Sequence, residues 1–287
     1  MQGKIVLITG ANDGIGLHTA QRLAEKGAQL ILACRDERKG HNAATLISQR
    51  TGNSKSLVIP LDLANLQSVQ AAAEFLLTEH PAIDVLINNA GIFSNTLQLT
   101  DDHFELQFGV NHLGHFLLTN LLLPALRCPQ EGGRVINVSS AAHYHGKIDF
   151  ENLSGEKGSK AYDGMQAYAQ SKLANVLFTK ELARRYPEDL TANCLHPGVV
   201  GTHFGNKHTN FLTSAIWNLY RPFARKPYRG ADTTVYLAAS PEVRDVSGRY
   251  FDQCQCVKRP SEAGRDEGLA RRLWEVSERM VAPFLVG

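Results

Sequence analysis

Strong net charge, abundant cysteine and long hydrophobic runs are all missing from this sequence. Among 287 residues, 30 Lys and Arg nearly balance 28 Asp and Glu. A chain without a concentrated positive charge lacks the electrostatic basis for binding nucleic acid, so that class of protein is disfavoured. The 43% of hydrophobic residues against 20% of charged residues excludes a disordered chain and provides enough apolar material for one large domain.

Cysteine is scarce, and the few cysteines are scattered. The set is Cys34, Cys128, Cys194, Cys254 and Cys256. An odd, scattered set in a chain of this length indicates a reducing compartment and not a disulfide framework. Cys254 and Cys256 form a C-x-C pair, but no second pair of Cys or His lies at zinc-site spacing, so we interpret both as free thiols and predict no metal.

Apolar runs long enough to cross a membrane are also missing. A membrane span needs about 18 consecutive apolar residues, and the nearest approach, 116–126, is interrupted by Thr119, Asn120 and Pro124. The apolar run at 5–8 is too short for the core of a signal peptide. We therefore expect a soluble protein of the cytoplasm without an amino-terminal anchor.

Short β-rich apolar runs alternate with longer segments of helical period along the chain. This alternation predicts a single-domain α/β fold of the Rossmann type over 1–287, with a doubly wound parallel sheet of about seven strands and helices on both faces. Ligands of such sheets bind beyond the carboxyl ends of the strands. The predicted strands are 5–9, 30–34, 56–61, 85–88, 135–139, 191–196 and 249–252, and the predicted helices include 17–26, 66–79, 104–126, 167–185 and 231–239.

Two segments interrupt the alternation, at 146–165 and at 203–227. The second carries Phe204, Phe211, Trp217, Tyr220 and Phe223 among basic residues. Because the alternation resumes after each segment, we interpret both as loops over a site, and 203–227 as a substrate lid. Contact of this segment with a membrane surface is the alternative, which the lack of a clean helical period among its aromatics disfavours.

A glycine-rich turn stands between the first predicted strand and the first predicted helix. Glycines allow a tight turn, and the backbone N–H groups at the start of a helix bind a pyrophosphate. The spacing G-x3-G-x-G departs from the standard dinucleotide fingerprint, but its place between strand and helix supports dinucleotide binding. The residues predicted to contact the cofactor here are Gly10, Asn12, Asp13, Gly14, Ile15 and Gly16.

Basic residues follow the second predicted strand. Arg35 stands where an acidic residue would bind the free ribose 2′-hydroxyl of NAD(H), and Lys39 follows closely. A guanidinium suits a 2′-phosphate, so we predict NADP(H) as the cofactor, with Arg35 and Lys39 among the residues that contact it. The neighbouring Asp36 keeps NAD(H) open as the alternative.

Polar and small residues follow the third and fourth predicted strands. Asp62 and Leu63 follow one strand, and Asn89, Ala90 and Gly91 follow the other. Asp62 can accept a hydrogen bond from an adenine amino group, and the small Ala90 and Gly91 let the backbone approach a cofactor. We therefore include all five in the predicted cofactor site.

Tyr168 and Lys172 lie four residues apart in a predicted helix and so share one of its faces. A free phenol has a pKa of about 10, and acid-base catalysis near neutrality requires this pKa to fall by about 2 to 3 units. An adjacent ammonium and an oxidised nicotinamide would favour the phenolate. Ser139 and Ser140 end the fifth predicted strand, and adjacent strand residues point to opposite faces, so one of the two hydroxyls faces the substrate.

This combination of motifs resembles the short-chain dehydrogenase/reductase family over nearly the whole chain, from 4 to 281. The matching segments are 9–16, 88–91, Asn111, 139–140, 168–172, 197–198 and Thr202. The resemblance implies that Tyr168 is the general acid in reduction and the base in oxidation. It implies that Lys172 binds the nicotinamide ribose and lowers the pKa of Tyr168, that Ser140 binds the substrate carbonyl, and that Asn111 holds a water linking Lys172 to solvent.

The same resemblance assigns the loop after the sixth predicted strand to the nicotinamide carboxamide. Its residues are Pro197, Gly198, Val200 and Thr202. Several histidines invite a metal site, but no acidic residues converge with them, so we interpret them as structural or substrate-lining. They are His112, His115, His143, His145 and His196.

Within the family the sequence is more similar to the retinol dehydrogenase branch, through 32–36, 111–116, 171–175 and 196–200. This similarity implies NADPH-dependent interconversion of a lipophilic alcohol and its aldehyde or ketone, with retinol and retinal among the substrates. The segment 146–165 is longer and more polar than in that branch, which leaves other substrates such as a steroid open. Protochlorophyllide reductases share similar motifs, so a tetrapyrrole is a further alternative substrate.

A cofactor-sensing regulator without catalysis is the competing class of function. Such a protein would have a broken catalytic set, whereas all four positions are filled here. The family often associates through the helices predicted at 104–126 and 167–185, so the resemblance also implies a homodimer or a homotetramer.

Overall fold

Eight strands form one sheet in the order β3-β2-β1-β4-β5-β6-β7-β8 within the residues that the computed structural model describes, 1–198, 227–258 and 260–285. Neighbouring strands from β3 to β7 run parallel, and β8 pairs antiparallel with β7. The predicted doubly wound α/β fold is confirmed. The strands are β1 (Ile5–Thr9), β2 (Gln29–Cys34), β3 (Ser56–Pro60), β4 (Val85–Asn88), β5 (Gly133–Val138), β6 (Leu190–His196), β7 (Arg249–Asp252) and β8 (Gln255–Cys256).

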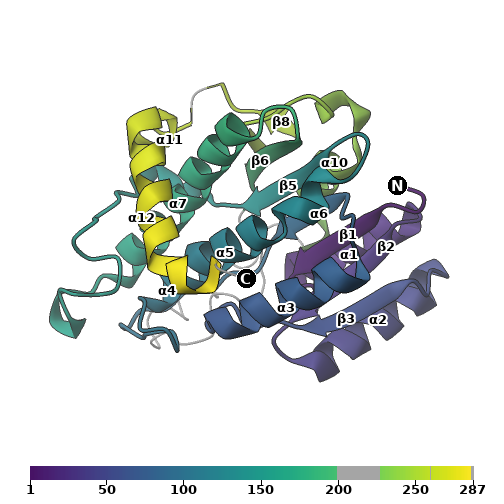
Figure 1. The fold of residues 1–287 in the computed structure, drawn as a ribbon, viewed down its shortest axis with the longest axis horizontal. Helices are drawn as coiled ribbons and strands as arrows, with labels where there is room; N and C mark the ends of the chain where they lie inside the picture. The colour runs from purple at the N-terminus through teal and green to yellow at the C-terminus, as the bar shows by residue number, and fades with distance from the viewer. Residues whose placement is uncertain (199–226, 259, 286–287) are drawn as a thin grey trace.

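Helices cover both faces of this sheet (Figure 1). Alternate residues of β1 point to opposite faces, as strand geometry requires: Leu7 joins one apolar cluster, and Val6 and Ile8 join the other. The helices are α1 (Gly14–Glu25), α2 (Glu37–Thr51), α3 (Leu66–Glu79), α4 (Leu106–Phe108), α5 (Gly114–Leu121), α6 (Leu123–Arg127), α7 (Gly164–Arg185), α9 (Pro227–Gly230), α10 (Asp232–Ala239), α11 (Glu262–Arg265) and α12 (Glu267–Leu285).

The helical segment predicted at 104–126 is largely confirmed, but it is not one regular α-helix: the structure has α4, a π-helical turn, η1 (Gly109–Leu113), then α5 and α6. Asn111 lies in this turn, and its side chain bonds both backbone groups of Ile92, accepting from the nitrogen at 2.8 Å and donating to the oxygen at 3.0 Å. Single π-helical turns are frequent at functional sites. A tertiary contact therefore accompanies the change from α-helix to π-helix.

The helix α7, which carries Tyr168, begins three residues before its predicted start. Asp163 is its N-cap and accepts from the backbone nitrogens of Met165 and Gln166. The segment before it, 146–163, has little regular structure apart from a short 3-10 turn, η3 (Ser159–Ala161). The predicted loop at 146–165 thus ends where this cap starts the helix.

The helix α12 closes one face of the fold. It runs alongside α5 and α7 (Figure 1), and its Trp274 packs against Phe116 and Phe178 with ring centroids 4.9 and 5.7 Å apart. None of the helices in the described ranges is long and apolar enough to cross a membrane. The segment predicted as a lid, 203–227, lies outside the described residues except for Pro227, which begins α9.

Candidate active site

The glycine-rich turn joins β1 to α1 at the carboxyl edge of the sheet. Gly10 and Gly14 have φ angles of +65° and +55°, which glycine adopts without strain. A Cβ atom on Gly16 would lie 2.4 Å from the carbonyl oxygen of Gly10, so this position accepts no side chain. Asp13 caps α1 by accepting from the backbone nitrogen of Gly14 at 2.7 Å. The turn is therefore tight and bare, as the approach of a pyrophosphate requires.

Asn89 and Ala90, both predicted cofactor residues, lie directly against this turn. The Asn89 side chain donates to the carbonyl oxygen of Thr9 at 2.8 Å. The backbone nitrogens of Asn89 and Ala90 each donate to the Thr9 hydroxyl at 3.0 Å. The structure thus gives Asn89 a supporting contact with the glycine-rich turn, and Thr9 is a supporting residue that our sequence reasoning missed.

Arg35 is exposed at the end of β2, next to an acid that already has partners. Asp36 caps α2 by accepting from the backbone nitrogen of Lys39 at 3.1 Å, and its carboxylate lies 3.4 Å from the Lys39 ammonium. These contacts with Lys39, the backbone hydrogen bond first, lower the pKa of Asp36. Asp36, the acid that could have favoured NAD(H), therefore caps the start of α2 and pairs with Lys39.

Asp62 and Leu63 form a local turn after β3. The Asp62 carboxylate accepts from the backbone nitrogen of Ala64 at 2.9 Å, and its own backbone nitrogen donates to the Ser68 hydroxyl at 3.0 Å. Leu63 is buried. These contacts fix the turn at the same sheet edge as the glycine-rich turn.

Ser140, Tyr168 and Lys172 come together at the carboxyl end of β5. The half-buried Tyr168 is hydrogen-bonded to the Ser140 side chain. The Lys172 ammonium donates to the carbonyl oxygen of Val138 at 3.0 Å and lies 5.7 Å from the centre of the Tyr168 ring. Phe93 contacts the same ring edge-on, with centroids 5.7 Å apart. A hydroxyl and an ammonium therefore both lie near the Tyr168 phenol.

Burial shifts the pKa of both titrating groups toward their uncharged forms. It raises the pKa of Tyr168 to about 12, and the hydrogen bond with Ser140 opposes this rise. It lowers the pKa of Lys172 to about 8, so the ammonium is still the main form near neutrality. Lys172 therefore stays positively charged beside Tyr168, where its charge would stabilise a phenolate.

The two serines at the end of β5 have different partners. Ser139 is buried, and its hydroxyl donates to the backbone oxygen of Lys172 at 2.7 Å. Ser140 caps the following 3-10 turn, η2 (Ala141–His145), by accepting from the backbone nitrogen of Ala142 at 3.2 Å. Its contact with Tyr168 distinguishes it from Ser139, whose hydroxyl supports α7.

Asn111 reaches α7 through Ser171 and is bound on its other side by Ile92. Its amide donates to the Ser171 hydroxyl at 3.0 Å, and that hydroxyl donates to the backbone oxygen of Tyr168 at 2.8 Å. Ser171 lies between Tyr168 and Lys172 in the chain, so Asn111 supports the turn of α7 that carries both residues. Sequence reasoning assigned Asn111 to a water and missed this contact.

Two histidines support the loop that carries Ser140. The ring of His143 lies 2.8 Å from the backbone oxygen of Ser140, and His196 accepts from the backbone nitrogen of Ala141 at 3.2 Å. Within the described ranges, no three His, Cys, Asp or Glu residues gather as metal ligands. Pro197 and Gly198 follow β6, Gly198 with a φ of +85°, whereas Val200 and Thr202 lie outside the described residues.

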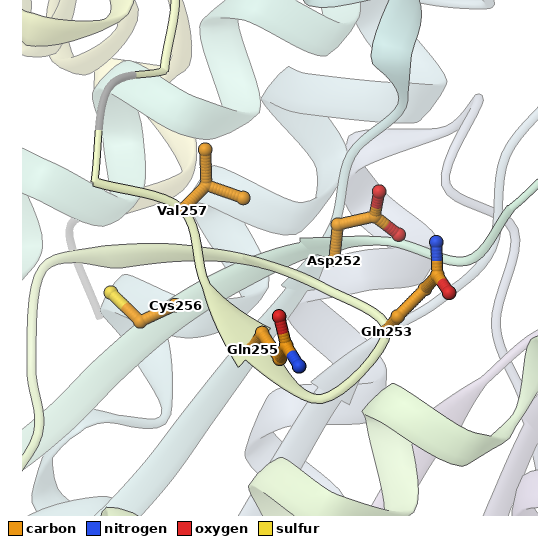
Figure 2. Close-up of a pocket in the computed structure, with 5 residues that line it drawn as sticks. All are labelled: Asp252, Gln253, Gln255, Cys256 and Val257. Carbon is orange, nitrogen blue, oxygen red and sulfur yellow. The ribbon is translucent and has the colours of Figure 1, made fainter.

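A cavity of about 340 Å³ opens beside the β7–β8 hairpin (Figure 2). The five residues that line it all come from this hairpin, and none belongs to the predicted site. They are Asp252, Gln253, Gln255, Cys256 and Val257. Gln253 and Cys254 form the turn with φ angles of +52° and +62°, typical of a two-residue hairpin.

Fold and site together define an oxidoreductase of the Rossmann type, and comparison with known proteins identifies its family. The family model described as short chain dehydrogenase matches residues 4–157. The chain belongs to the short-chain dehydrogenase/reductase family.

Its curated relatives include several retinol dehydrogenases. Retinol dehydrogenase 14 of Mus musculus is 47% identical over 294 residues, covering 98% of this chain and 86% of that protein. Retinol dehydrogenase 13 of Homo sapiens is 45% identical over 284 residues, covering 97% of this chain and 85% of that protein. The predicted similarity to the retinol dehydrogenase branch is confirmed.

Solved structures share the fold of this chain. An uncharacterised protein from Mycobacterium paratuberculosis is 40% identical with a TM-score of 0.77, covering 98% of this chain and 94% of that chain. A short-chain dehydrogenase from Shigella flexneri, solved with NADP, is 25% identical with a TM-score of 0.69, covering 89% of this chain and 98% of that chain. The predicted fold class is thus confirmed a second time.

Proposed function

We propose that this protein is an NADP(H)-dependent oxidoreductase that interconverts a lipophilic alcohol and its aldehyde or ketone. The observation that carries the proposal is the contact of Tyr168 with Ser140, with the Lys172 ammonium beside the same phenol ring. A hydrogen-bonded phenol next to a retained cation is suited to give a proton to a carbonyl oxygen or to take one from an alcohol.

The glycine-rich turn and the end of β2 would hold the cofactor. Gly10, Gly14 and Gly16 form a surface that a Cβ atom at Gly16 would obstruct, which fits a pyrophosphate against the start of α1. Arg35 is exposed at the strand end and would bind a 2′-phosphate, since Asp36 is engaged with Lys39. The NADP bound to the Shigella flexneri relative supports this choice.

Other contacts of the cofactor are proposed from the family pattern. Near the glycine-rich turn they involve Asn12, Asp13 and Ile15, and after β3 and β4 they involve Asp62, Leu63, Asn89, Ala90 and Gly91. On the nicotinamide side they involve Tyr168, Lys172, Pro197, Gly198, Val200 and Thr202. The cofactor supplies or accepts the hydride at its nicotinamide ring.

The protein's own residues handle the proton. In reduction, the Ser140 hydroxyl donates to the substrate oxygen and holds it beside Tyr168, whose phenol gives its proton to that oxygen. In oxidation the Tyr168 phenolate takes the proton back. Because burial raises the pKa of Tyr168 to about 12, the phenolate must be stabilised by the Lys172 ammonium and by the positive charge of an oxidised nicotinamide. We propose that Asn111 holds the turn of α7 and a water that returns protons to Lys172.

The proposed substrate class comes from the names of the relatives and not from the shape of a cavity. The curated relatives named retinol dehydrogenases support a lipophilic alcohol, with retinol and retinal as the first pair to test. Steroids and tetrapyrroles are the other classes for the screen.

We further propose a cytoplasmic location and a homo-oligomer. All five cysteines are free, which supports a reducing compartment. The helix α12 packs along α5 and α7. In a homo-oligomer, the second subunit would therefore contact α12 itself or the surface of α5 and α7 that α12 does not cover. Light scattering after size exclusion, at several protein concentrations, measures the mass directly.

An NADPH-oxidation screen tests the function. Purified protein is offered retinal, a steroid ketone, a quinone and an alkyl aldehyde, and we expect turnover with a hydrophobic carbonyl. Tyr168→Phe should abolish turnover and leave NADPH binding, measured by fluorescence, within about twofold. If no carbonyl is turned over while NADPH still binds, the protein is a cofactor sensor and the proposal fails.

A further inference from the structure

A buried histidine joins the cofactor edge of the sheet to the turn that carries Asn111. His115 lies in the first turn of α5 with 2% of its surface exposed. Its Nε2 lies 2.9 Å from the hydroxyl oxygen of Thr9, the last residue of β1. Its Nδ1 lies 3.2 Å from the main-chain oxygen of Asn111, in the π-helical turn. The imidazole therefore bridges β1 and the turn before α5.

Hydrogen-bond chemistry fixes the direction of this bridge. Burial lowers the pKa of His115 to about 3, so its ring is neutral and has one N–H group. A carbonyl oxygen only accepts, so Nδ1 is the donor to Asn111. Nε2 is then an acceptor. The Thr9 hydroxyl has one proton and two acceptors in reach, and it donates to Nε2 at 2.9 Å in preference to the Ile87 carbonyl oxygen at 3.4 Å.

The Thr9 hydroxyl is itself the acceptor for the turn after β4. The backbone nitrogens of Asn89 and Ala90 both donate to it at 3.0 Å. The chain of hydrogen bonds thus runs from this turn through Thr9 and His115 to the Asn111 carbonyl. Hydrogen bonds linked in this way in a buried region strengthen one another.

On its far side the bridge reaches the catalytic helix. The Asn111 amide donates to Ser171, which stands next to Lys172 in α7. Thr9, Asn111 and Ser171 are fully buried, so none of these bonds competes with water. A displacement of the turn after β4 therefore has a continuous path to the residues that carry Tyr168 and Lys172.

We propose that His115 is a positioning residue that transmits cofactor binding at 89–91 to the catalytic turn of α7. This inference rests on the proposed function, because it assigns the turn at 89–91 to the cofactor. It gives the second histidine of the N-H-L-G-H segment a role that a merely structural histidine does not have. Coupling between sites must be measured directly, and substitutions of His115 can remove the two hydrogen bonds of the bridge separately.

Three substitutions separate the two bonds of the bridge. In His115→Asn the amide nitrogen can take the place of Nδ1 and keep the bond to Asn111. In His115→Gln the amide reaches the place of Nε2 and keeps the bond to Thr9. His115→Phe removes both bonds and keeps a ring. His112→Phe is the matched control, because His112 is equally buried but lies 2.8 Å from Ser277 of α12.

Amide hydrogen exchange with and without NADPH tests the proposal without any substrate. In the wild type and in the His112→Phe control, NADPH should slow exchange at 89–91 and also at 109–116. In His115→Phe the slowing should remain at 89–91 and be lost at 109–116. The Asn and Gln variants, which each keep one bond, should also lose it, so the test does not depend on the Phe variant folding.

Turnover provides a second readout. With an active carbonyl substrate, kcat of His115→Phe should fall about tenfold while the Kd for NADPH stays within about twofold. Lack of slowing at 109–116 in the wild type, or its persistence in His115→Phe, overturns the proposal. A wild type that shows the slowing but turns over no carbonyl overturns the proposed function and leaves His115 in its role.

Discussion

The ammonium nitrogen of Lys172 lies 3.0 Å from the carbonyl oxygen of Val138, and 3% of the residue is exposed. Asn175 donates to the same oxygen at 3.3 Å. A buried cation held by a neutral carbonyl, without a described carboxylate partner, is costly to the fold. The fold therefore keeps at its candidate active site a charge that packing alone would not favour.

Lys172→Met should stabilise the protein below about pH 8 and abolish its activity. The folded pKa of about 8 is below the unfolded value of about 10.4, so between these values the unfolded chain binds more protons. The cost of the buried ammonium is fully present below pH 8 and disappears as the pH rises toward 10.4. The variant should gain about 3 kcal/mol at pH 7, less the lost hydrogen bond, and nothing near pH 10.5.

Urea unfolding between pH 7 and pH 10.5 measures this difference. Lys180→Met is the control on the same helix, because the Lys180 side chain is more exposed and lies 3.5 Å from Glu267. A difference between wild type and Lys172→Met that stays constant with pH would contradict the argument.

Arg35→Asp should move the cofactor preference from NADPH toward NADH. A charge-assisted hydrogen bond contributes about 1.5 to 3 kcal/mol, so KM for NADPH should rise by about 10-fold to 100-fold. Arg38→Asp, one residue into α2 and also exposed, is the control for a change of net charge. Steady-state kinetics with both cofactors measures the change. An equal rise of KM for NADPH in Arg35→Asp and Arg38→Asp would show that Arg35 does not contact the phosphate.

Gly16→Ala should destroy cofactor binding. The added Cβ would lie 2.4 Å from the Gly10 oxygen and 2.6 Å from the Asn89 amide nitrogen, so the glycine-rich turn must move. We expect a loss of more than about tenfold in NADPH affinity and about 1 to 3 kcal/mol of stability. Gly268→Ala serves as the control, since its Cβ would meet only Asp266 at 3.3 Å. NADPH titration of a folded Gly16→Ala protein that binds normally would refute this prediction.

Tyr162→Phe should destabilise the protein without touching the catalytic residues. The Tyr162 hydroxyl donates to the buried Glu105 carboxylate at 2.7 Å. Burial raises the pKa of Glu105, and hydrogen bonds from Gln107, Tyr162 and Phe108 oppose that rise. Removal of one donor should cost about 1 to 3 kcal/mol. Urea unfolding measures it against Tyr144→Phe, where the side chain is 46% exposed and no loss is expected.

Local patterns predicted the strands and the motifs well because each strand is a short buried run that ends in small or polar residues. Helix spacing predicted that Tyr168 and Lys172 share one face, whereas the choice of Ser140 over Ser139 came from the family resemblance. The start of α7 at Gly164 depends on the Asp163 cap, a signal that was readable in the sequence. The helix α12 was missed, although Leu269, Leu273 and Met280 recur at its helical spacing.

Other features depend on contacts between distant parts of the chain and could not be predicted. The π-helical turn at Gly109–Leu113 lies inside a segment of helical period, and the contact of its Asn111 with Ile92 comes from a distant loop. The bridge from Thr9 to His115 joins residues 106 positions apart. Sequence spacing carries no sign of either contact, so His112 and His115 were interpreted only as structural or substrate-lining.

The packing of α12 against α5 and α7 also sets an order of events during synthesis. Ser277 and His112, which lie 2.8 Å apart, are separated by 165 positions, so the ribosome must make more than half of the chain between them. Until α12 leaves the exit tunnel, Phe116 and Phe178 lack the ring of Trp274 that covers them. A nascent chain that already holds the whole sheet therefore still lacks the cover that α12 gives to the aromatic side chains of α5 and α7.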